Sequence, residues 1–405
     1  MDYRGEVAVR SLRIRIFAFS YIIYAIYYVG RVNFSVALPA IASDLGFSKV
    51  TLGLIGGMFS IIYALGQLIN GQLVERFGAK KMVTFGLLLS AAANLLFGYA
   101  EVAILMILLW SVNGYAQSTG WPSVVKLLSE WFGRGSRGEV SGLFGTCFLV
   151  GSMAALTFSG YILTKFGWRT LFLFPSIIFL LLIVPFNLTV KERRIQEETV
   201  NTRSIGRLTL SRKIFVFATA YVLLQFVRSG FELWAPSYIF EVYGTPLEYA
   251  GYGAAIIPVG GIVGSVLAGW ASDKISGAQR APVMAVMTSF LVLILILLYK
   301  SVEAGFLVNA FLLFLGGLTL YGPHVLMVTT IPMDYDDRYG AASIAGFIDG
   351  LGYMGSTFAN PFIGWLVDSK GWGAAITFWT VSSLLATLLT ASVWIKDRKT
   401  LSGRP

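Results

Sequence analysis

The chain has 405 residues, 56% of them hydrophobic and only 13% charged, which is about half the charged share of an average soluble domain. The apolar residues come in runs of twenty or more, enough for a helix to cross roughly 30 Å of hydrocarbon, so a soluble globular protein is excluded. The net charge of +10 lies between these runs rather than in one basic stripe, so we expect no nucleic-acid partner. One cysteine and one histidine exclude a disulfide framework and a metal cluster built from these residues, so neither metal nor cofactor is expected.

Twelve apolar stretches are predicted to be transmembrane helices. In chain order they cover residues 16–41, 50–74, 82–100, 102–129, 138–163, 169–190, 214–242, 248–272, 281–299, 304–331, 340–367 and 373–395. The first has no small-residue cleavage site, so we expect it to be retained rather than removed as a signal peptide.

The Lys and Arg residues predict the orientation of the chain. Of these 31 residues, 23 lie in the two tails and the even-numbered connections, five in the odd-numbered connections and three within spans. By the positive-inside rule, both termini are cytoplasmic. We therefore expect a multi-pass protein of the cell inner (plasma) membrane, in contact with lipid.

Two related halves are predicted, because short strings recur about 200 residues apart in one order. Gly71–Lys81 recurs as Gly269–Arg280, GWP at 120–122 as YGP at 321–323, and FGWR at 166–169 as KGWG at 370–373. The charged stretch 191–213 lacks an apolar face and is predicted to be a cytoplasmic linker between six-helix bundles 1–190 and 214–405. Parallel halves of this kind place a substrate site at their interface near the bilayer midplane.

The Gly71–Lys81 segment resembles the motif that the major facilitator superfamily carries between its second and third helices, with Glu75 where aspartate is commoner. The resemblance implies an all-α integral membrane fold, with twelve transmembrane helices in two six-helix bundles, and transport by alternating access. The residues expected to latch one conformation by cytoplasmic ion pairs are Glu75, Arg76, Lys80, Lys81, Asp273 and Lys274.

Two arginines lie deep within the predicted spans, where a charge costs about 2.5–3.5 kcal/mol on the insertion scale and so needs a reason. Arg31 is about fifteen residues into the first span and Arg228 about fourteen into the seventh, hence both lie roughly 21–22 Å from their cytoplasmic ends. Each belongs to a polar stripe on one helix face. The stripes are Tyr24, Tyr28, Arg31 and Ser35, and Tyr221, Gln225, Arg228 and Glu232.

Two arginines at matching depth, one from each half, predict a binding site for a dianion. The guanidinium charge is permanent, and its fork meets a phosphate or carboxylate with two hydrogen bonds. A phosphate monoester carries a charge of about −1.5 to −2 at pH 7, which two arginines nearly neutralise. The alternative is that both arginines are locked in salt bridges, Arg228 with Glu232 or Asp349.

Three strings narrow the resemblance: YYVGRVNFSVALPAI at 27–41, GWPSVVKLLSEWF at 120–132 and FVRSGFELWAPSYIFEVYG at 226–244. They resemble the organophosphate:phosphate antiporter family, whose members exchange sugar phosphates or glycerol phosphate for inorganic phosphate. These members carry one arginine on the first helix and one on the seventh, which implies that role for Arg31 and Arg228. Glycerol-phosphate members have lysine where this chain has Gln67 and histidine where it has Phe148, so glycerol 3-phosphate is not expected to be preferred.

Several further polar residues within spans are weighed. Lys126 is expected to pair with Glu130, four residues on, and His324 to be packed or to line the cavity. Asp349 is expected to balance Arg228, to contact a polar substrate group or to take up a proton. Asn33, Asn113 and Gln117 are expected to line the cavity.

The sequence contains no catalytic constellation, so an enzyme is excluded. The expected function is exchange of a phosphorylated small molecule for inorganic phosphate, by a monomer. Two alternatives stay open: a proton- or sodium-coupled organic-anion symporter, and a transporter-like membrane sensor of a sugar phosphate.

Overall fold

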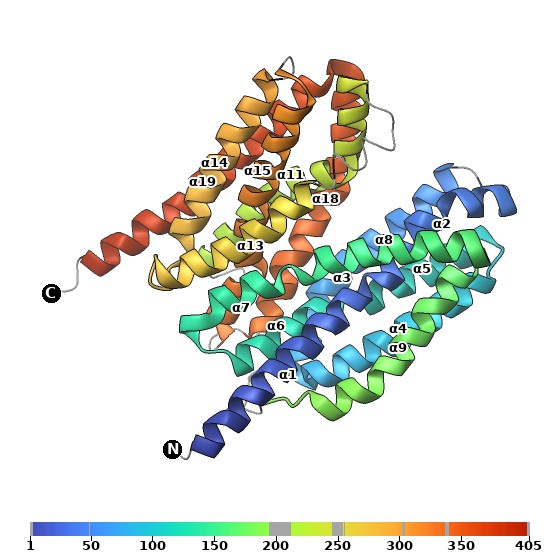
Figure 1. Cartoon of the computed structure of the whole chain (residues 1–405), viewed down its shortest axis with the longest axis horizontal. Helices are drawn as coiled ribbons and strands as arrows, with labels where there is room; N and C mark the ends of the chain where they lie inside the picture. The colour runs from blue at the N-terminus through green and yellow to red at the C-terminus, as the bar shows by residue number, and fades with distance from the viewer. Residues whose placement is uncertain are drawn as a thin grey trace. The chain divides into compact units, whose positions relative to one another are not determined.

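The computed structural model describes residues 3–47, 49–193, 212–244, 254, 256–301, 304–336 and 340–402, and no strand occurs in these ranges. The helices of the first half are α1 (Tyr3–Tyr27), α2 (Val29–Leu45), α3 (Lys49–Phe77), α4 (Ala79–Tyr99), α5 (Ala103–Gln117), α6 (Gly120–Trp131), η1 (Arg134–Ser136), α7 (Arg137–Phe144), α8 (Cys147–Phe166) and α9 (Thr170–Thr189). They are followed by α11 (Arg212–Tyr243), α13 (Ile256–Lys274), α14 (Arg280–Lys300), α15 (Phe306–Val325), η3 (Leu326–Thr330), α16 (Ile331–Asp334), α18 (Ala341–Lys370) and α19 (Trp372–Ser402) (Figure 1).

Eleven of the twelve predicted spans coincide with one helix or with a run of consecutive helices. The eighth, 248–272, overlaps α13, and its residues 248–253 and 255 lie outside the described residues. The first is divided at Tyr28 into α1 and α2, and the fourth at Ser118 and Thr119 into α5 and α6. Pro122 explains the second break, because it has no N–H to donate to the carbonyl four residues earlier. The hydroxyl groups of Ser118 and Thr119 instead donate to the carbonyls of Tyr115 and Ala116, at 2.6 and 2.8 Å.

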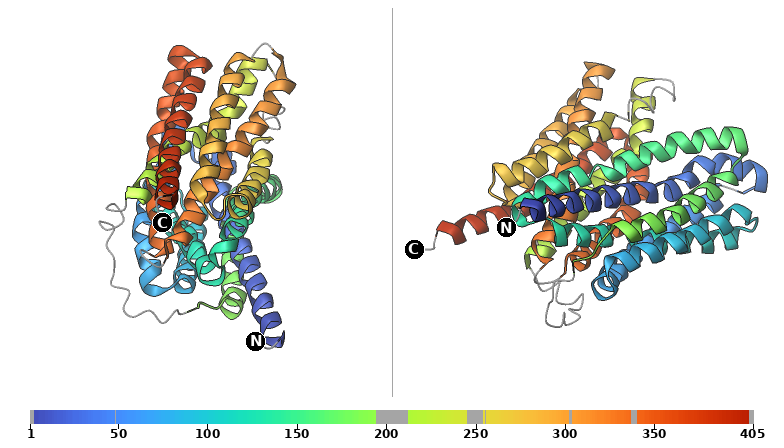
Figure 2. Two further views of the ribbon diagram at one scale, coloured as in Figure 1. Left: turned by 90° about the vertical axis from the view of Figure 1, so that its left-hand side faces the viewer. Right: turned by 60° about the horizontal axis from the view of Figure 1, so that its bottom comes forward.

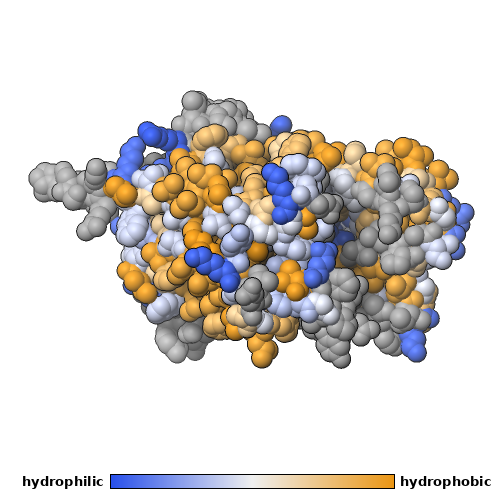
Figure 3. All heavy atoms as spheres, turned by 90° about the horizontal axis from the view of Figure 1, so that it is seen from above, coloured by the Kyte–Doolittle hydropathy of each residue, from blue (hydrophilic) through white to orange (hydrophobic). Residues whose placement is uncertain are grey.

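Ten stretches of the described chain are helices long and apolar enough to cross a membrane. The fourth predicted span is not among them because its two helices are short, and the eleventh, α18, is rich in glycine and carries Asp349. Large hydrophobic side chains are exposed along these helices, among them Leu307 at 81% and Leu188 at 77%. Hydrophobic side chains also cover much of the surface visible in Figure 3, as expected of a surface that faces lipid rather than water.

The chain forms two compact units. The first comprises Met1–Gly133, Cys147–Ile205 and Pro332–Gly350, and the second comprises Arg134–Thr146, Gly206–Ile331 and Leu351–Pro405. Each unit thus takes in a short segment from the other predicted bundle. The bundle boundaries at 190 and 214 stay a prediction, and residues 194–211 of the predicted linker lie outside the described residues.

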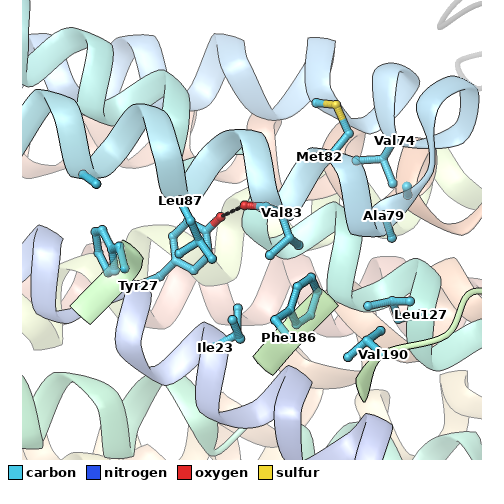
Figure 4. Packing of buried hydrophobic residues seen from close by; sticks show 13 residues of the cluster. Ile23, Tyr27, Val74, Ala79, Met82, Val83, Leu87, Leu127, Phe186 and Val190 are labelled. Carbon is cyan, nitrogen blue, oxygen red and sulfur yellow. Dashed lines mark hydrogen bonds between the residues drawn. The ribbon is translucent and has the colours of Figure 1, made fainter. Parts of the chain in front are cut away.

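The core of the first unit lies where α1, α4 and α9 meet, and α4 runs beside α9 in all three views (Figures 1 and 2). Ile23 and Tyr27 of α1 pack there against Val83 and Leu87 of α4 and against Phe186 of α9 (Figure 4). The Tyr27 hydroxyl donates to the carbonyl oxygen of Val83 at 3.2 Å, because a buried hydroxyl needs a partner.

An indole–carboxylate pair recurs in the two halves and accounts for one of the repeated strings. In FGWR, Trp168 Nε1 donates to Asp44 Oδ2 at 3.0 Å, and Arg169 Nη1 pairs with the same oxygen at 2.6 Å. In KGWG, Trp372 Nε1 donates to Glu241 Oε2 at 2.8 Å. The hydrogen bonds from Trp168 and then Arg169 lower the pKa of Asp44. A tryptophan at the start of the last helix of the second half, or two residues before that of the first half, thus holds an acid near the end of the first predicted span of the same half.

Candidate functional site

Arg31 lies in the first turn of α2, three residues after Tyr28, and is surrounded by aromatic rings and one amide. Its guanidinium carbon is 4.5 Å from the ring centre of Tyr63 and 4.7 Å from that of Tyr28. Its Nη2 donates to Gln117 Oε1 at 3.5 Å. Rings stabilise a cation through their negative faces without neutralising it, so these contacts orient the guanidinium of Arg31.

Buried amides fix Gln117 and the backbone beside Arg31. Gln117 Nε2 donates to Ser90 Oγ at 3.0 Å, so its oxygen faces Arg31. Asn113 donates to the carbonyl of Gly30 at 2.8 Å, and Asn33 to the carbonyl of Leu171 at 3.0 Å. Asn33 and Asn113 are both buried and bonded to backbone, and their place in a cavity stays a prediction.

The other predicted residues of the first helix form an aromatic cluster next to Arg31. The ring centres of Tyr24 and Tyr28 are 6.0 Å apart, and those of Tyr28 and Phe148 are 6.2 Å apart. Tyr24, Tyr28 and Phe148 are all buried. Phe148 is therefore in contact with the ring that covers Arg31.

Asp349 and Gln67 lie together in the first unit. Gln67 Nε2 donates to Asp349 Oδ2 at 2.8 Å and to the Tyr63 hydroxyl at 2.7 Å. Asp349 therefore has a role that the sequence did not predict: it accepts a hydrogen bond from a neutral amide.

Arg228 of α11 is held by three side chains of the second unit. Its Nε pairs with Glu232 Oε1 at 2.8 Å, one turn along the same helix. Its Nη1 is 3.4 Å from Gln225 Oε1 and 2.8 Å from His324 Nε2. The Arg228 side chain is 8% exposed and that of Glu232 46%. The predicted ion pair with Glu232 therefore exists, with its carboxylate half-exposed.

The contact with Arg228 fixes the form of His324. A guanidinium only donates hydrogen bonds, so His324 Nε2 must accept, which places the ring proton on Nδ1 of a neutral imidazole. The Tyr221 hydroxyl is 3.0 Å from the same nitrogen, and Tyr321, three residues before His324, donates to Glu232 Oε1 at 2.8 Å. Tyr321 and His324 are three residues apart within YGPH, a spacing that puts both side chains on one helix face. This spacing could have indicated that the two residues contact the same partners.

The surroundings of the two arginines share one feature, a neutral hydrogen-bond acceptor. They stand 197 positions apart (228 minus 31), and each is oriented by a neutral acceptor, Gln117 of α5 or His324 of α15, in the fourth helix of its half. A neutral acceptor orients a guanidinium without cancelling its charge, and Arg228 is in addition paired with the carboxylate of Glu232. Such an arrangement can bind an anion.

The first predicted latch is built around Glu75. Its carboxylate pairs with Lys126 Nζ at 2.5 Å and accepts from the backbone N–H of Ala342 at 2.7 Å, at the start of α18. The expected pairing of Lys126 with Glu130 is wrong, since Glu75, distant in sequence, takes Lys126. The negative charge of Glu75 also matches the positive N-terminal end of α18.

The second latch repeats this arrangement in the other unit. Asp273 accepts from the backbone N–H of Glu139 at 2.9 Å, at the start of α7, and pairs closely with Arg280. Lys274 pairs with Glu139 at 3.5 Å. A side chain on Gly138 would collide with the carbonyl of Gly269, so glycine is required where α7 crosses α13.

The remaining predicted latch residues behave differently. Arg76 and Lys81 are exposed, and Arg76 lies over the ring of Phe77 at 5.3 Å. The backbone N–H of Lys80, in the first turn of α4, donates to Glu192 Oε1 at 2.7 Å. In the described part of the chain no three His, Cys, Asp or Glu side chains are grouped as metal ligands would be.

Comparison with known proteins identifies the family to which the chain belongs. The sequence model of the Major Facilitator Superfamily matches residues 20–354. The chain is 30% identical to the glycerol-3-phosphate transporter of Bacillus subtilis, covering 97% of this chain and 95% of that one. It is 27% identical to a "Probable hexose phosphate transport protein" of Chlamydia pneumoniae, over 96% and 92% of the two chains. It is 25% identical to the membrane sensor protein UhpC of Escherichia coli, over 90% and 88%.

Solved structures agree in fold. The transporter FucP in the outward conformation matches with a TM-score of 0.77 at 16% identity, covering 94% of this chain and 99% of that one. The proton:xylose symporter XylE matches with a TM-score of 0.75 at 15% identity, covering 95% and 96%. The predicted all-α, twelve-helix fold is confirmed, and so is the prediction that the chain is not an enzyme.

Proposed function

Because the chain belongs to the Major Facilitator Superfamily, we propose that it transports a phosphorylated small organic anion and exchanges it for inorganic phosphate by alternating access. Arg31 and Arg228 bind the anion. The observation that carries this proposal is that each deep arginine is oriented by a neutral acceptor, Gln117 or His324, on the corresponding helix of its half. Each guanidinium is thus oriented from the corresponding helix of its half, and at Arg228 an anion would share the guanidinium with Glu232.

The names of the relatives support a phosphate ester as the substrate. Two of them are named for hexose phosphate and glycerol 3-phosphate, and they are matched over nearly their whole length. Gln67 and Phe148 are occupied in packing and in hydrogen bonds with this chain's own side chains. We therefore propose that the substrate is a phosphate ester and, from the departures at Gln67 and Phe148, that glycerol 3-phosphate is not the preferred one.

A membrane sensor is the second candidate, and it is favoured by the similarity to UhpC. A sensor and a transporter would bind the same phosphate ester. They differ in whether the ester crosses the membrane, so binding and transport must be measured separately.

A binding screen of the purified protein tests the proposal. The ligands are glucose 6-phosphate, glycerol 3-phosphate, inorganic phosphate, and a dicarboxylate and glucose as controls that lack phosphate. We expect phosphate and the hexose phosphate to raise the unfolding temperature by mass action, and the dicarboxylate and glucose to leave it unchanged. A response to the dicarboxylate but not to any phosphate would contradict the proposal, and glycerol 3-phosphate as the strongest ligand would contradict its second part.

The Glu75 and Asp273 latches are proposed to hold the helix starts that they cap during one half of the transport cycle. Glu75→Gln and Asp273→Asn keep the side-chain shape but lose the charge that matches the helix end and pairs with Lys126 or Arg280. We expect each to change the turnover rate about tenfold while leaving the Kd for phosphate nearly unaltered, because the change biases a conformational equilibrium by about 1–2 kcal/mol.

The matched control is Glu101→Gln, an exposed acid that pairs only at the surface with Arg169. Uptake rates and equilibrium binding are measured on the same preparations. Rates equal to wild type in both latch variants would show that Glu75 and Asp273 have no gating role.

A further inference from the structure

A chain of contacts runs from α18 through α3 to Arg31, and it lies entirely in the first unit. Asp349 Oδ2 accepts from Gln67 Nε2 at 2.8 Å, and the same nitrogen donates to the Tyr63 hydroxyl at 2.7 Å. The Tyr63 ring then faces the guanidinium of Arg31 at 4.5 Å. Asp349 is thus connected to the arginine through two intermediate side chains.

Burial makes each of these contacts necessary. Gln67 is 0% exposed, Tyr63 1% and Asp349 5%. A buried polar group without a hydrogen bond is costly, and a buried carboxylate more so. If one of these contacts is broken, the next side chain along the chain of contacts is left without its partner in a buried position.

The carboxylate decides which way the Gln67 amide points. If the amide turned over, its oxygen would face the oxygen of Asp349, and both groups would be acceptors. With the nitrogen toward Asp349, both amide hydrogens are used, one on Asp349 and one on Tyr63. The Tyr63 hydroxyl must then accept, and its ring, stacked on Phe59 at an interplanar angle of 14°, is fixed in the position that covers Arg31.

Asp349 is itself held in place by the close docking of α18 on α3. A side chain on Gly71 would come within 2.7 Å of the carbonyl oxygen of Ala342, and one on Gly346 would collide with the carbonyl of Gln67. Ser343 Oγ also donates to the carbonyl of Gly71 at 3.3 Å. The backbone of α18 thus sets the position of the carboxylate relative to Gln67.

We propose that Asp349 is a positioning residue for the anion site, which acts on Arg31 through Gln67 and Tyr63. Its carboxylate serves as a hydrogen-bond acceptor, rather than as a proton carrier or a direct contact of the substrate. The inference rests on the proposed function, because it requires that Arg31 binds the anion.

The test is calorimetric titration of the purified full-length protein with inorganic phosphate. Asp349→Asn keeps an acceptor oxygen and should leave the Kd nearly unchanged, whereas Asp349→Leu removes it and should weaken binding about tenfold. Gln67→Met, which removes the donor at similar volume, should weaken binding by the same factor and gives a second route if Asp349→Leu fails to fold. Thr357→Val, which removes a hydroxyl bonded within α18, is the control and should bind as wild type.

Tyr63 provides a readout that a merely structural role would not move. If Asp349 acts through Tyr63, the double variant Asp349→Leu with Tyr63→Phe should bind phosphate no more weakly than the weaker single variant, because effects within one network are not additive. Fully additive losses would overturn the inference.

The other outcomes are also decisive. Asp349→Asn as weak as Asp349→Leu would show that the charge itself acts, and wild-type binding in Asp349→Leu and Gln67→Met would show that neither matters. Either result overturns the positioning role while leaving the proposed function intact. Failure of the wild type to bind phosphate or any ester overturns both.

Discussion

Arg228→Lys and Arg31→Lys are each expected to weaken phosphate binding by about a hundredfold or more, since two charge-assisted hydrogen bonds are lost. Lysine keeps the charge, but its N–H groups all diverge from one nitrogen and cannot form the planar pair of parallel hydrogen bonds that a guanidinium makes. At position 228 the guanidinium can donate to Glu232, to His324 and to an anion from different N–H groups. A lysine ammonium at this position cannot make all three hydrogen bonds at once. The measurement is the Kd for inorganic phosphate, with the amount of folded protein in the membrane measured in parallel.

The matched control is Arg169→Lys, which changes an exposed arginine that pairs with Asp44. This variant should bind phosphate as wild type does. Wild-type affinity in both Arg31→Lys and Arg228→Lys would show that the anion site lies elsewhere. A loss in Arg31→Lys alone would favour the alternative that Arg228 serves only its ion pair with Glu232.

Internal phosphate is expected to accelerate uptake of a labelled hexose phosphate into proteoliposomes by about tenfold or more. In the empty carrier, Glu232 forms an ion pair with Arg228. A change of about 1.4 kcal/mol in the barrier to reorientation is enough for a tenfold change in rate. An anion that binds both arginines lowers the cost of closing the site around it, because it favours the closed state over the open one.

The control separates exchange from symport. Vesicles with and without internal phosphate are compared at equal pH, and then vesicles without phosphate are given a pH gradient. Equal uptake in the first comparison, with strong accumulation in the second, would replace the antiporter by a proton symporter. Binding of the ester without any uptake would instead support a sensor.

Glu232 adds an expectation to the exchange experiment. Because its carboxylate is half-exposed and bonded to Arg228 and to Tyr321, an incoming anion competes with it for the guanidinium. Glu232→Gln removes the competing charge while keeping the oxygen that accepts from Tyr321. The same vesicle assay on this variant would show whether competition between Glu232 and the incoming anion for Arg228 sets the exchange rate.

The helices could be predicted almost completely from the sequence. The spans at 281–299 and 169–190, for example, differ from α14 and α9 by one residue at either end. Hydrophobic length is a local property, and in lipid every backbone group must be bonded within its own helix, so a long apolar run has few alternatives to a helix. The repeat was visible for the same reason, since FGWR and KGWG each place a tryptophan at or just before the start of a helix.

The partners of the buried polar side chains could not be predicted from the sequence. Lys126 was paired with Glu130 because residues four apart are neighbours on one helix, yet it binds Glu75, which is 51 positions away. His324 reaches Arg228 across 96 positions and Gln67 reaches Asp349 across 282. Periodicity gives the face on which a residue lies but not which helix packs against that face.

The sequence by itself thus determined the membrane class, the twelve spans and the twofold repeat, and it predicted a matching depth for Arg31 and Arg228. These features follow from apolar length and from counting residues along a helix. Only the tertiary structure decided which acceptors orient the two arginines and which helix ends Glu75 and Asp273 cap. The physical reason is that a buried polar group takes whichever partner the packing brings within about 3 Å, and that partner comes from another helix.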